Sequence, residues 1–161
     1  MKTAQWEMKS RIGSVFLVAS GTGLRGIYWD RQADPMAASL AGSSSEILIL
    51  AQTVRELEEY FRGERKDFTI PLEVEGTSFQ KRVWEELKRI PYGTTVSYRD
   101  VAMRIRNGKA FRAVGTANGR NPISIIVPCH RVIAADGTLG GYGGGLPIKT
   151  KLLEIERCHV E

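Results

Sequence analysis

The chain has 161 residues, of which 42% are hydrophobic and 25% are charged. This composition excludes a disordered chain and indicates one globular domain or two small ones. No apolar run reaches the roughly 20 residues that span a bilayer, and Trp6 and Glu7 interrupt the region where a signal peptide would be apolar. We therefore expect a cytoplasmic protein without a membrane segment. The two cysteines and two histidines are too few for a structural zinc site, so we expect no metal and no cofactor.

The positive charge is concentrated in the middle of the chain. Residues 79–131 contain 11 Lys and Arg against 3 Asp and Glu, whereas residues 1–78 contain 9 against 11 and residues 132–161 contain 3 against 4. A basic block of this kind suits a polyanion, and phosphate backbones are the commonest such partner. Charge alone fits a solvated helical face equally well.

The first part of the chain predicts a small α+β domain, residues 1–76. Two apolar runs, residues 15–19 and 24–29, flank Gly21-Thr22-Gly23, which is typical of a β-hairpin with a glycine turn. Residues 68–74 alternate between apolar and polar side chains, as a further strand does. No pattern with recognisable chemistry occurs in this domain.

A helix is predicted between the hairpin and this last strand. Apolar residues at positions 47, 50, 51, 54, 57 and 61 repeat at helical spacing. Ser43 and Glu46 have the spacing of a capping box at its start, and Gly63 is a typical stop signal.

The second domain, residues 77–161, begins with another capping box. Thr77 and Gln80 predict the start of a helix with apolar residues at 79, 83, 87 and 90, which ends before Pro91. This helix opens the basic block described above.

A candidate helix-turn-helix follows. Ser97 and Asp100 predict the cap of a short helix that runs to Ile105, Asn107-Gly108 predicts a turn, and residues 110–118 predict a second helix. Any helical domain contains such pairs, so the pattern by itself is weak evidence for DNA binding.

The second helix of this pair is rich in small residues. Ala110, Ala113 and Gly115 would let its backbone approach a DNA groove closely, with Arg112 reaching into the groove. Packing against another helix would use the same small residues. The surrounding basic block favours the DNA-binding interpretation.

The residues with recognisable chemistry follow a predicted buried strand over residues 123–127. This strand would deliver Cys129 and His130 at its end, and a cysteine near a histidine can become a nucleophilic thiolate. Neighbours in an extended chain point to opposite faces, so we expect His130 to act through a bridging water, unless another base serves. Six glycines in residues 137–145 predict a loop that offers backbone amides to a ligand, and the last helix places Glu156 beside its core-facing side.

At these residues the sequence resembles the O6-alkylguanine-DNA alkyltransferase family. The resemblance covers residues 79–156 without a gap, and over residues 1–75 it is architectural only. The motifs that carry it are Phe79-Gln80, Val83-Trp84, Ile90-Pro91-Tyr92-Gly93, Ser97-Tyr98, Arg112-Ala113-Val114-Gly115, Asn121-Pro122, Pro128-Cys129-His130-Arg131-Val132, Gly140-Gly141-Tyr142, Leu152-Leu153 and Glu156. We therefore expect an α+β protein: a small N-terminal antiparallel-sheet domain with a helix, then a mainly helical C-terminal domain that contains the helix-turn-helix.

The resemblance implies a DNA repair protein, a methyltransferase that reacts once. Such a protein docks its helix-turn-helix in the minor groove of double-stranded DNA and rotates O6-alkylguanine out of the duplex. It then transfers the alkyl group irreversibly and stoichiometrically to its own cysteine. The implied roles are Cys129 as acceptor, His130 as the base acting through a water, Glu156 as the residue that orients the imidazole, and Asn121 as the brace of this turn. We expect a monomer in solution, and whether O4-alkylthymine is also a substrate stays open.

The resemblance also implies contacts to the flipped base. Tyr98 would donate a proton or hydrogen bond to the guanine ring as the base leaves. The backbone carbonyls of Cys129 and Val132 would accept from the exocyclic amine, and an amide near Gly143 would face O6. Arg112 would fill the space that the flipped nucleotide vacates.

Several positions depart from the family pattern. Phe111 stands where a small residue is usual. Asn118 and Ser124 stand where some members have Met and Pro in the alkyl pocket, and Gly143 stands where some have Ser. These departures leave the pocket size and the preferred alkyl group open. Cys158 matches no family role.

Three other functions compete with this one. A transcription regulator would share the helix-turn-helix and the basic charge, but it would not need Cys129, His130 and Tyr98 together. An alkyltransferase-like binding protein would flip damaged bases without an acceptor thiol. A thiol hydrolase would need a base in direct reach of the thiol. Of these, only an alkyltransferase gains the mass of one methyl group when incubated with O6-methylguanine DNA.

Overall fold

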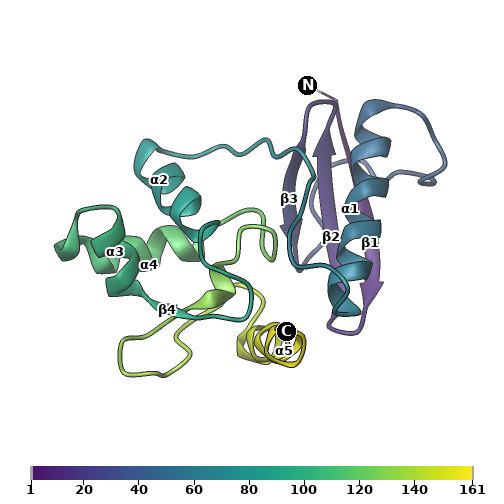
Figure 1. Cartoon of the computed structure of the whole chain (residues 1–161). Helices are drawn as coiled ribbons and strands as arrows, with labels where there is room; N and C mark the ends of the chain where they lie inside the picture. Colours follow the sequence, from purple (N-terminus) through teal and green to yellow (C-terminus); the bar gives the residue numbers. More distant parts are fainter. Residues whose placement is uncertain (1, 161) are drawn as a thin grey trace. The chain divides into compact units, whose positions relative to one another are not determined.

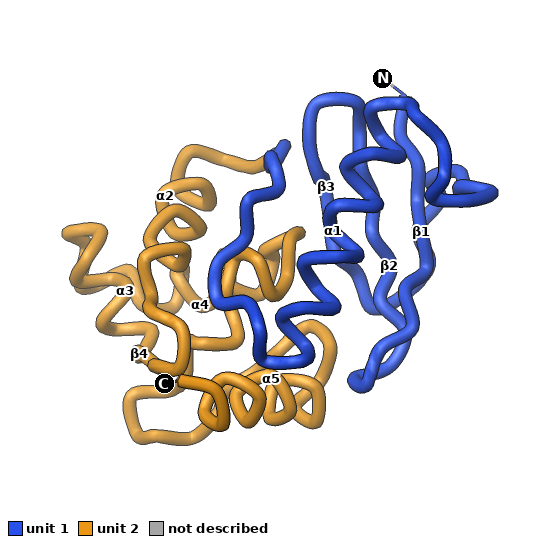
Figure 2. Tube along the Cα trace, turned by 45° about the vertical axis from the view of Figure 1, so that its right-hand side comes forward, with its two compact units in different colours: residues 1–75 blue, residues 76–161 orange. Residues whose placement is uncertain are grey.

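Two units make up this chain, residues 1–75 and residues 76–161 (Figure 2). The computed structural model describes residues 2–160. The first unit is an antiparallel sheet with one long helix, and the second is mainly helical with a short parallel strand pair (Figure 1). The expected α+β fold class is therefore confirmed.

The predicted hairpin is confirmed in the first unit. It consists of β2 (Gly13–Ser20) and β3 (Leu24–Tyr28), which pair antiparallel. The amide of Ser20 donates to the carbonyl of Gly23 across the glycine turn, at 2.9 Å. The sheet has the order β1-β2-β3, so β2 is its central strand.

The first strand, β1 (Thr3–Ser10), is missing from the sequence prediction. A polar residue, Gln5, is fully buried in this strand. Its side-chain amide donates to the carbonyls of Gln32 and Asp34, at 3.0 and 2.9 Å, and its Oε1 accepts from the amide of Gln32 at 2.8 Å. Alternation of apolar and polar residues is the sequence signal of a half-buried strand. A buried glutamine with satisfied hydrogen bonds interrupts this alternation, and the strand is therefore not predicted.

The long helix α1 (Ser45–Phe61) packs against all three strands of the sheet (Figure 1). Its predicted capping box is wrong, because the N-cap is Ser44 and the side chain of this serine makes no capping hydrogen bond. The residue three positions after Ser44 is Ile47, whose apolar side chain cannot accept the hydrogen bond from the Ser44 backbone amide that completes a capping box. The predicted stop is confirmed, since Gly63 follows the helix with a φ of +76°.

The strand predicted over residues 68–74 is wrong. In the described chain this segment forms one isolated parallel bridge, between Leu72 and Leu24. The amide of Leu24 donates to the carbonyl of Pro71, and the amide of Glu73 donates to the carbonyl of Leu24, both at 2.8 Å. Proline has no amide hydrogen to donate, so a regular ladder cannot extend through this position.

In the described part of the second unit, residues 76–160, four α-helices are the main regular elements (Figure 1). The elements are α2 (Ser78–Leu87), β4 (Val96–Ser97), α3 (Tyr98–Arg104), the 3-10 turn η1 (Gly108–Ala110), α4 (Phe111–Gly119), the 3-10 turn η2 (Cys129–Arg131), β5 (Val132–Ile133) and α5 (Leu146–Cys158). Both capping boxes predicted here, at Thr77 and at Ser97, are confirmed. Helices α2, α3 and α4 pack on one another, and α3, η1 and α4 form the predicted helix-turn-helix. Within residues 2–160, no helix combines the length and apolarity needed to cross a bilayer.

The buried strand predicted over residues 123–127 is wrong. The segment is largely buried, but the chain turns: the amide of Val127 donates to the carbonyl of Ile123 at 3.0 Å, and Ile125 has a φ of +74°. A short apolar run does not distinguish a strand from a buried turn. The turn leads into η2, which contains Cys129 and His130. The expectation that these two side chains point to opposite faces assumed an extended chain, so it does not apply here.

Candidate active site

A buried carboxylate organises the centre of the second unit. Glu156 on α5 is 1% exposed, and its Oε2 lies 2.6 Å from Nε2 of His130. Arg131 donates to both carboxylate oxygens, from Nε at 2.7 Å and from Nη2 at 3.1 Å. Burial alone would raise the pKa of Glu156, but hydrogen bonds from His130 and Arg131 outweigh it and lower this pKa well below its usual range. The carboxylate is therefore an anion at neutral pH.

His130 is held as a neutral base. Its ring is fully buried, and burial lowers its pKa even though Glu156 opposes this effect. An ionised carboxylate only accepts hydrogen bonds, so Nε2 carries the proton that is donated to Glu156. The other ring nitrogen, Nδ1, has no hydrogen-bond partner among the described residues. Nδ1 is therefore the nitrogen that can accept a proton.

The thiol of Cys129 lies at the start of η2 and is almost completely buried. Burial raises the pKa of this thiol, while the side chain of Asn121 and the charge of Lys149 oppose the rise. A thiol with a raised pKa is protonated at neutral pH, and only the thiolate is a strong nucleophile. A base must therefore remove this proton before Cys129 can react.

Asn121 spans the turn that precedes the cysteine. Its Nδ2 donates to the carbonyl of Val127 at 2.7 Å, and its Oδ1 accepts from the amide of Ile123 at 3.0 Å. The amide of Cys129 donates to the same Val127 carbonyl at 2.8 Å. One side chain thus closes a turn that regular secondary structure does not hold.

Lys149 on α5 is a fully buried cation whose charge acts on the thiol of Cys129. Its Nζ donates to the carbonyls of Val132 at 2.7 Å, of Gly141 at 3.3 Å, and of Leu139. Burial lowers the pKa of Lys149, and its interaction with Cys129 opposes this effect. The lysine therefore connects the glycine-rich loop to β5.

Sequence reasoning misses both Arg131 and Lys149 as members of the site. Lys149 stands seven residues before Glu156, a spacing that puts both on one helical face, and this signal could have found it. Arg131 gives no local signal, because its partners Glu156 and the carbonyl of Ile90 lie 25 and 41 residues away in the chain.

Tyr98 lies between two glycines. A Cβ added to Gly140 would lie 2.9 Å from the Tyr98 hydroxyl, and one added to Gly115 would lie 3.8 Å from its ring. The hydroxyl therefore lies against the glycine-rich loop and the ring lies against α4. Burial raises the pKa of Tyr98, and the neighbouring Cys129 raises it further, so the phenol keeps its proton.

The residues predicted to contact DNA gather at the start of α4. They are Ala110, Arg112, Ala113 and Gly115, of which Arg112 and Ala113 are exposed. Between them, Phe111 is partly exposed, and the guanidinium groups of Arg99 and Arg112 lie 5.1 and 5.9 Å from its ring centre. Phe111 is thus a surface ring between two cations, on the face that the sequence assigns to DNA.

The other positions singled out from the sequence have mixed environments. Val132 is buried in β5, and Asn118 is buried with its Nδ2 donating to the carbonyl of Cys129 at 3.4 Å. Gly143 is exposed, and a Cβ there would meet no atom within 4 Å, so the loop has room at this position. Cys158 is exposed at the end of α5.

The fold and the site define a class of protein: a helix-turn-helix unit that carries a buried thiol beside a histidine oriented by a carboxylate. Residues 78–158 match the model of the 6-O-methylguanine DNA methyltransferase DNA binding domain. Residues 7–74 match the ribonuclease-like domain of the same proteins. The chain therefore belongs to the 6-O-methylguanine DNA methyltransferase family.

Individual relatives agree with this assignment. A methylated-DNA--protein-cysteine methyltransferase of Mycobacterium leprae is 47% identical over 95% of this chain and 92% of its own length. One of Methanosarcina acetivorans is 61% identical over 63% of this chain and 65% of its own length. The crystal structure of Mycobacterium tuberculosis OGT in complex with DNA superposes with a TM-score of 0.85 and 41% identity, covering 97% of this chain and 94% of that one.

Proposed function

We propose that this chain is a DNA repair protein that rotates O6-alkylguanine out of double-stranded DNA and transfers the alkyl group, irreversibly and stoichiometrically, to Cys129. Membership of the family supports alkyl transfer from DNA to a cysteine. The observation that carries the choice of cysteine is the neutral His130, held by Glu156, beside a buried thiol. Cys158, by contrast, is exposed at the end of α5.

The transfer requires one proton movement and one exchange of bonds. The proton of Cys129 passes through a water to Nδ1 of His130, and Glu156 stabilises the imidazolium that forms. The sulfur then forms a bond to the alkyl carbon while the bond from that carbon to O6 breaks. The guanine leaves with the electron pair, and the protonated phenol of Tyr98 donates to its ring. The product is a thioether, which does not release the alkyl group, so each molecule reacts once.

The flipped base is recognised by backbone groups and one tyrosine. The carbonyls of Cys129 and Val132 accept from its exocyclic amine, and an amide near Gly143 faces O6. The Val132 carbonyl already accepts from Lys149, and its second lone pair is available to the base. On the DNA side, Arg112 at the exposed start of α4 fills the place of the extruded nucleotide.

Intact-mass measurement tests the proposal. The wild-type chain should gain one methyl group per molecule on incubation with O6-methylguanine DNA and then stop. Cys129→Ser should abolish the gain while leaving DNA binding nearly intact, because a hydroxyl has almost the same shape but is far less acidic. Cys158→Ser is the matched control and should react as wild type does.

An unchanged mass of the wild-type chain would favour the regulator or the hydrolase, and loss of the gain in Cys158→Ser would show that the acceptor is misassigned. The cytoplasmic location and the monomeric state stay predictions.

A further inference from the structure

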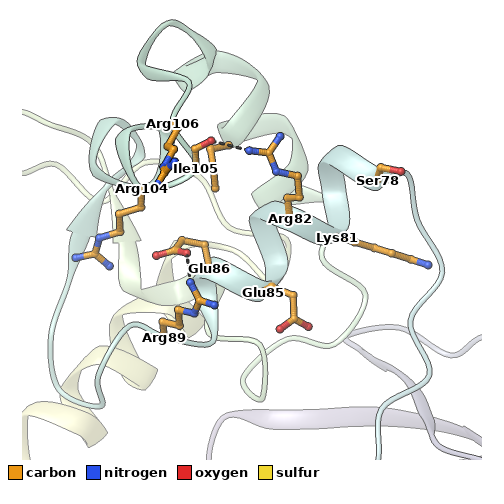
Figure 3. A pocket seen from close by; sticks show the side chains of 9 residues that line it. All are labelled: Ser78, Lys81, Arg82, Glu85, Glu86, Arg89, Arg104, Ile105 and Arg106. Atoms are coloured by element: carbon orange, nitrogen blue, oxygen red, sulfur yellow. Dashed lines mark hydrogen bonds and ion pairs between the residues drawn. The ribbon is translucent and has the colours of Figure 1, made fainter.

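A second basic surface lies on α2 and at the end of α3, on residues that the proposed function does not use. Helix α2 and the end of α3 enclose a groove of about 430 Å³ (Figure 3). Its lining comes from α2, from Arg89 just after it and from residues 104–106, whereas the proposed DNA-docking residues are Ala110 and residues at the start of α4. The groove is therefore separate from the surface that α4 offers.

The two acidic residues of this groove are already compensated. Lys88 Nζ lies 3.0 Å from Oε1 of Glu85, and Arg89 Nη1 lies 3.1 Å from Oε2 of Glu86. Figure 3 shows the second of these pairs as a dashed line beside the groove. The two carboxylates of the groove are thus paired with Lys88 and Arg89, and among the other cations Arg104 has one acidic neighbour, Asp100.

Four cations remain: Lys81, Arg82, Arg104 and Arg106. Arg82 donates from Nη2 to the carbonyl of Ile105 at 2.6 Å, which fixes its guanidinium at the end of α3 (Figure 3). The other three side chains are exposed and make no hydrogen bond or ion pair with the described residues. A guanidinium has five donors, so Arg82 also keeps free donors for a ligand.

Arg106 occupies an unusual position for an arginine. It follows the C-cap of α3 with a φ of +60°, the left-handed conformation that helices usually end on with Gly or Asn. An arginine at this position is conformationally costly, and its side chain makes no hydrogen bond or ion pair with the described residues that would compensate the cost. This points to a role for the charge outside the fold itself.

We propose that this groove binds the phosphate backbone of duplex DNA next to the segment docked on α4, independently of any lesion. The proposal rests on the proposed function, which makes DNA the partner. Phosphates recur along each strand, so four cations spread over α2 and the end of α3 fit them better than they fit a single anion, even though Arg104 also has Asp100 as an acidic neighbour. Arg106 directly precedes the turn between α3 and α4, which places the groove beside the docking helix along the chain.

A triple variant removes the charges that the fold does not use. It combines Lys81→Ala, Arg104→Ala and Arg106→Asn, because asparagine tolerates the left-handed conformation. The matched control, Lys9→Ala with Lys151→Ala and Arg157→Ala, removes three exposed charges elsewhere. Fluorescence anisotropy measures the affinity of each for undamaged duplexes of about 30 and about 12 base pairs, the shorter one little more than the helical turn that one reading helix occupies.

We expect the triple variant to bind the longer duplex about tenfold more weakly at low salt. The slope of log K against log salt should become shallower by about 2 to 3, since each lost phosphate contact removes about 0.9. Affinity for the shorter duplex should change less than about twofold, and the control should bind both duplexes as wild type does. Equal unfolding midpoints in urea show that the loss is not one of folding.

A salt slope of the triple variant equal to that of the control would overturn the proposal. Equal losses of affinity for both duplexes would also overturn it, because the groove would then contact the same DNA segment that docks on α4. If the triple variant keeps its DNA affinity but self-associates less than wild type, the groove binds an acidic protein surface instead of DNA. The reaction with free O6-benzylguanine should be the same in wild type and triple variant. If wild type itself gains no mass, the proposed function fails while the anisotropy result still decides the groove.

Discussion

Replacing Glu156 by glutamine tests the buried carboxylate at the centre of the site. The amide keeps the volume but removes the negative charge that faces His130 and Arg131, and the Arg131 side chain is only 7% exposed. Removing one partner of a buried ion pair costs about 3 to 5 kcal/mol, because the other charge stays buried without compensation. We expect the free energy of unfolding of the second unit to fall by about this amount, a large share of the roughly 5 to 15 kcal/mol that domains possess.

Urea unfolding followed by the fluorescence of Trp84 measures this loss. Trp84 is buried in α2 of the second unit, so Trp6 and Trp29 of the first unit are replaced by Phe in every protein compared. Glu154→Gln, an exposed position on α5, is the control and should change the free energy of unfolding by less than about 0.5 kcal/mol. A loss below about 1 kcal/mol in Glu156→Gln would refute the reasoning, because it would mean that Arg131 does not depend on this carboxylate.

The pH dependence of this difference has a defined sign. The folded-state pKa of Glu156 is lowered, so its stabilisation is complete above the pKa of an unfolded glutamate and is lost as pH falls toward the lower folded value. The difference between wild type and Glu156→Gln should be constant from pH 8 to about 5 and then shrink by about 1.4 kcal/mol per pH unit below about 4.3. A difference that stays constant below this pH would show that the carboxyl is not stabilised as an anion.

Four further outcomes are expected. Arg112→Ala should slow repair in duplex DNA much more than reaction with free O6-benzylguanine, because extrusion of a base costs a few kcal/mol; equal losses in single-turnover rates would place Arg112 in support of the fold. Gly140→Ala should slow transfer at least about tenfold, since its methyl would meet the Tyr98 hydroxyl and its φ is +70°; an unchanged rate would show that this hydroxyl moves freely. Because burial lowers the pKa of His130, an unfolded histidine takes up a proton near pH 6.5 before the folded one does, so stability in urea should fall from about pH 7 to 5. His130→Asn should flatten this slope, and parallel slopes would contradict the assignment. Alkylation of Cys129 should destabilise the chain by about 1 to 3 kcal/mol through overpacking, more for benzyl than for methyl, and unchanged thermal midpoints for both adducts would exclude it.

Local signals predicted those parts of the fold that local interactions hold. The capping boxes at Thr77 and Ser97 join residues three apart, and the hairpin turn joins Ser20 to Gly23, so a few neighbouring residues contain all the information. The strand predicted over residues 123–127 is wrong because an apolar run records burial and not backbone direction. The direction there depends on Asn121, whose side chain closes the turn.

The sequence by itself leads to Cys129, His130 and Glu156 as candidates, because their residue types and spacing carry the family resemblance, and their catalytic roles stay predictions. It could not determine their protonation states, which depend on burial and on partners that are distant along the chain. Only the tertiary structure brings Arg131 onto Glu156 and Lys149 near the thiol. The physical reason is that a pKa reflects the charges and the solvent within a few ångströms, and folding alone decides which residues occupy that space.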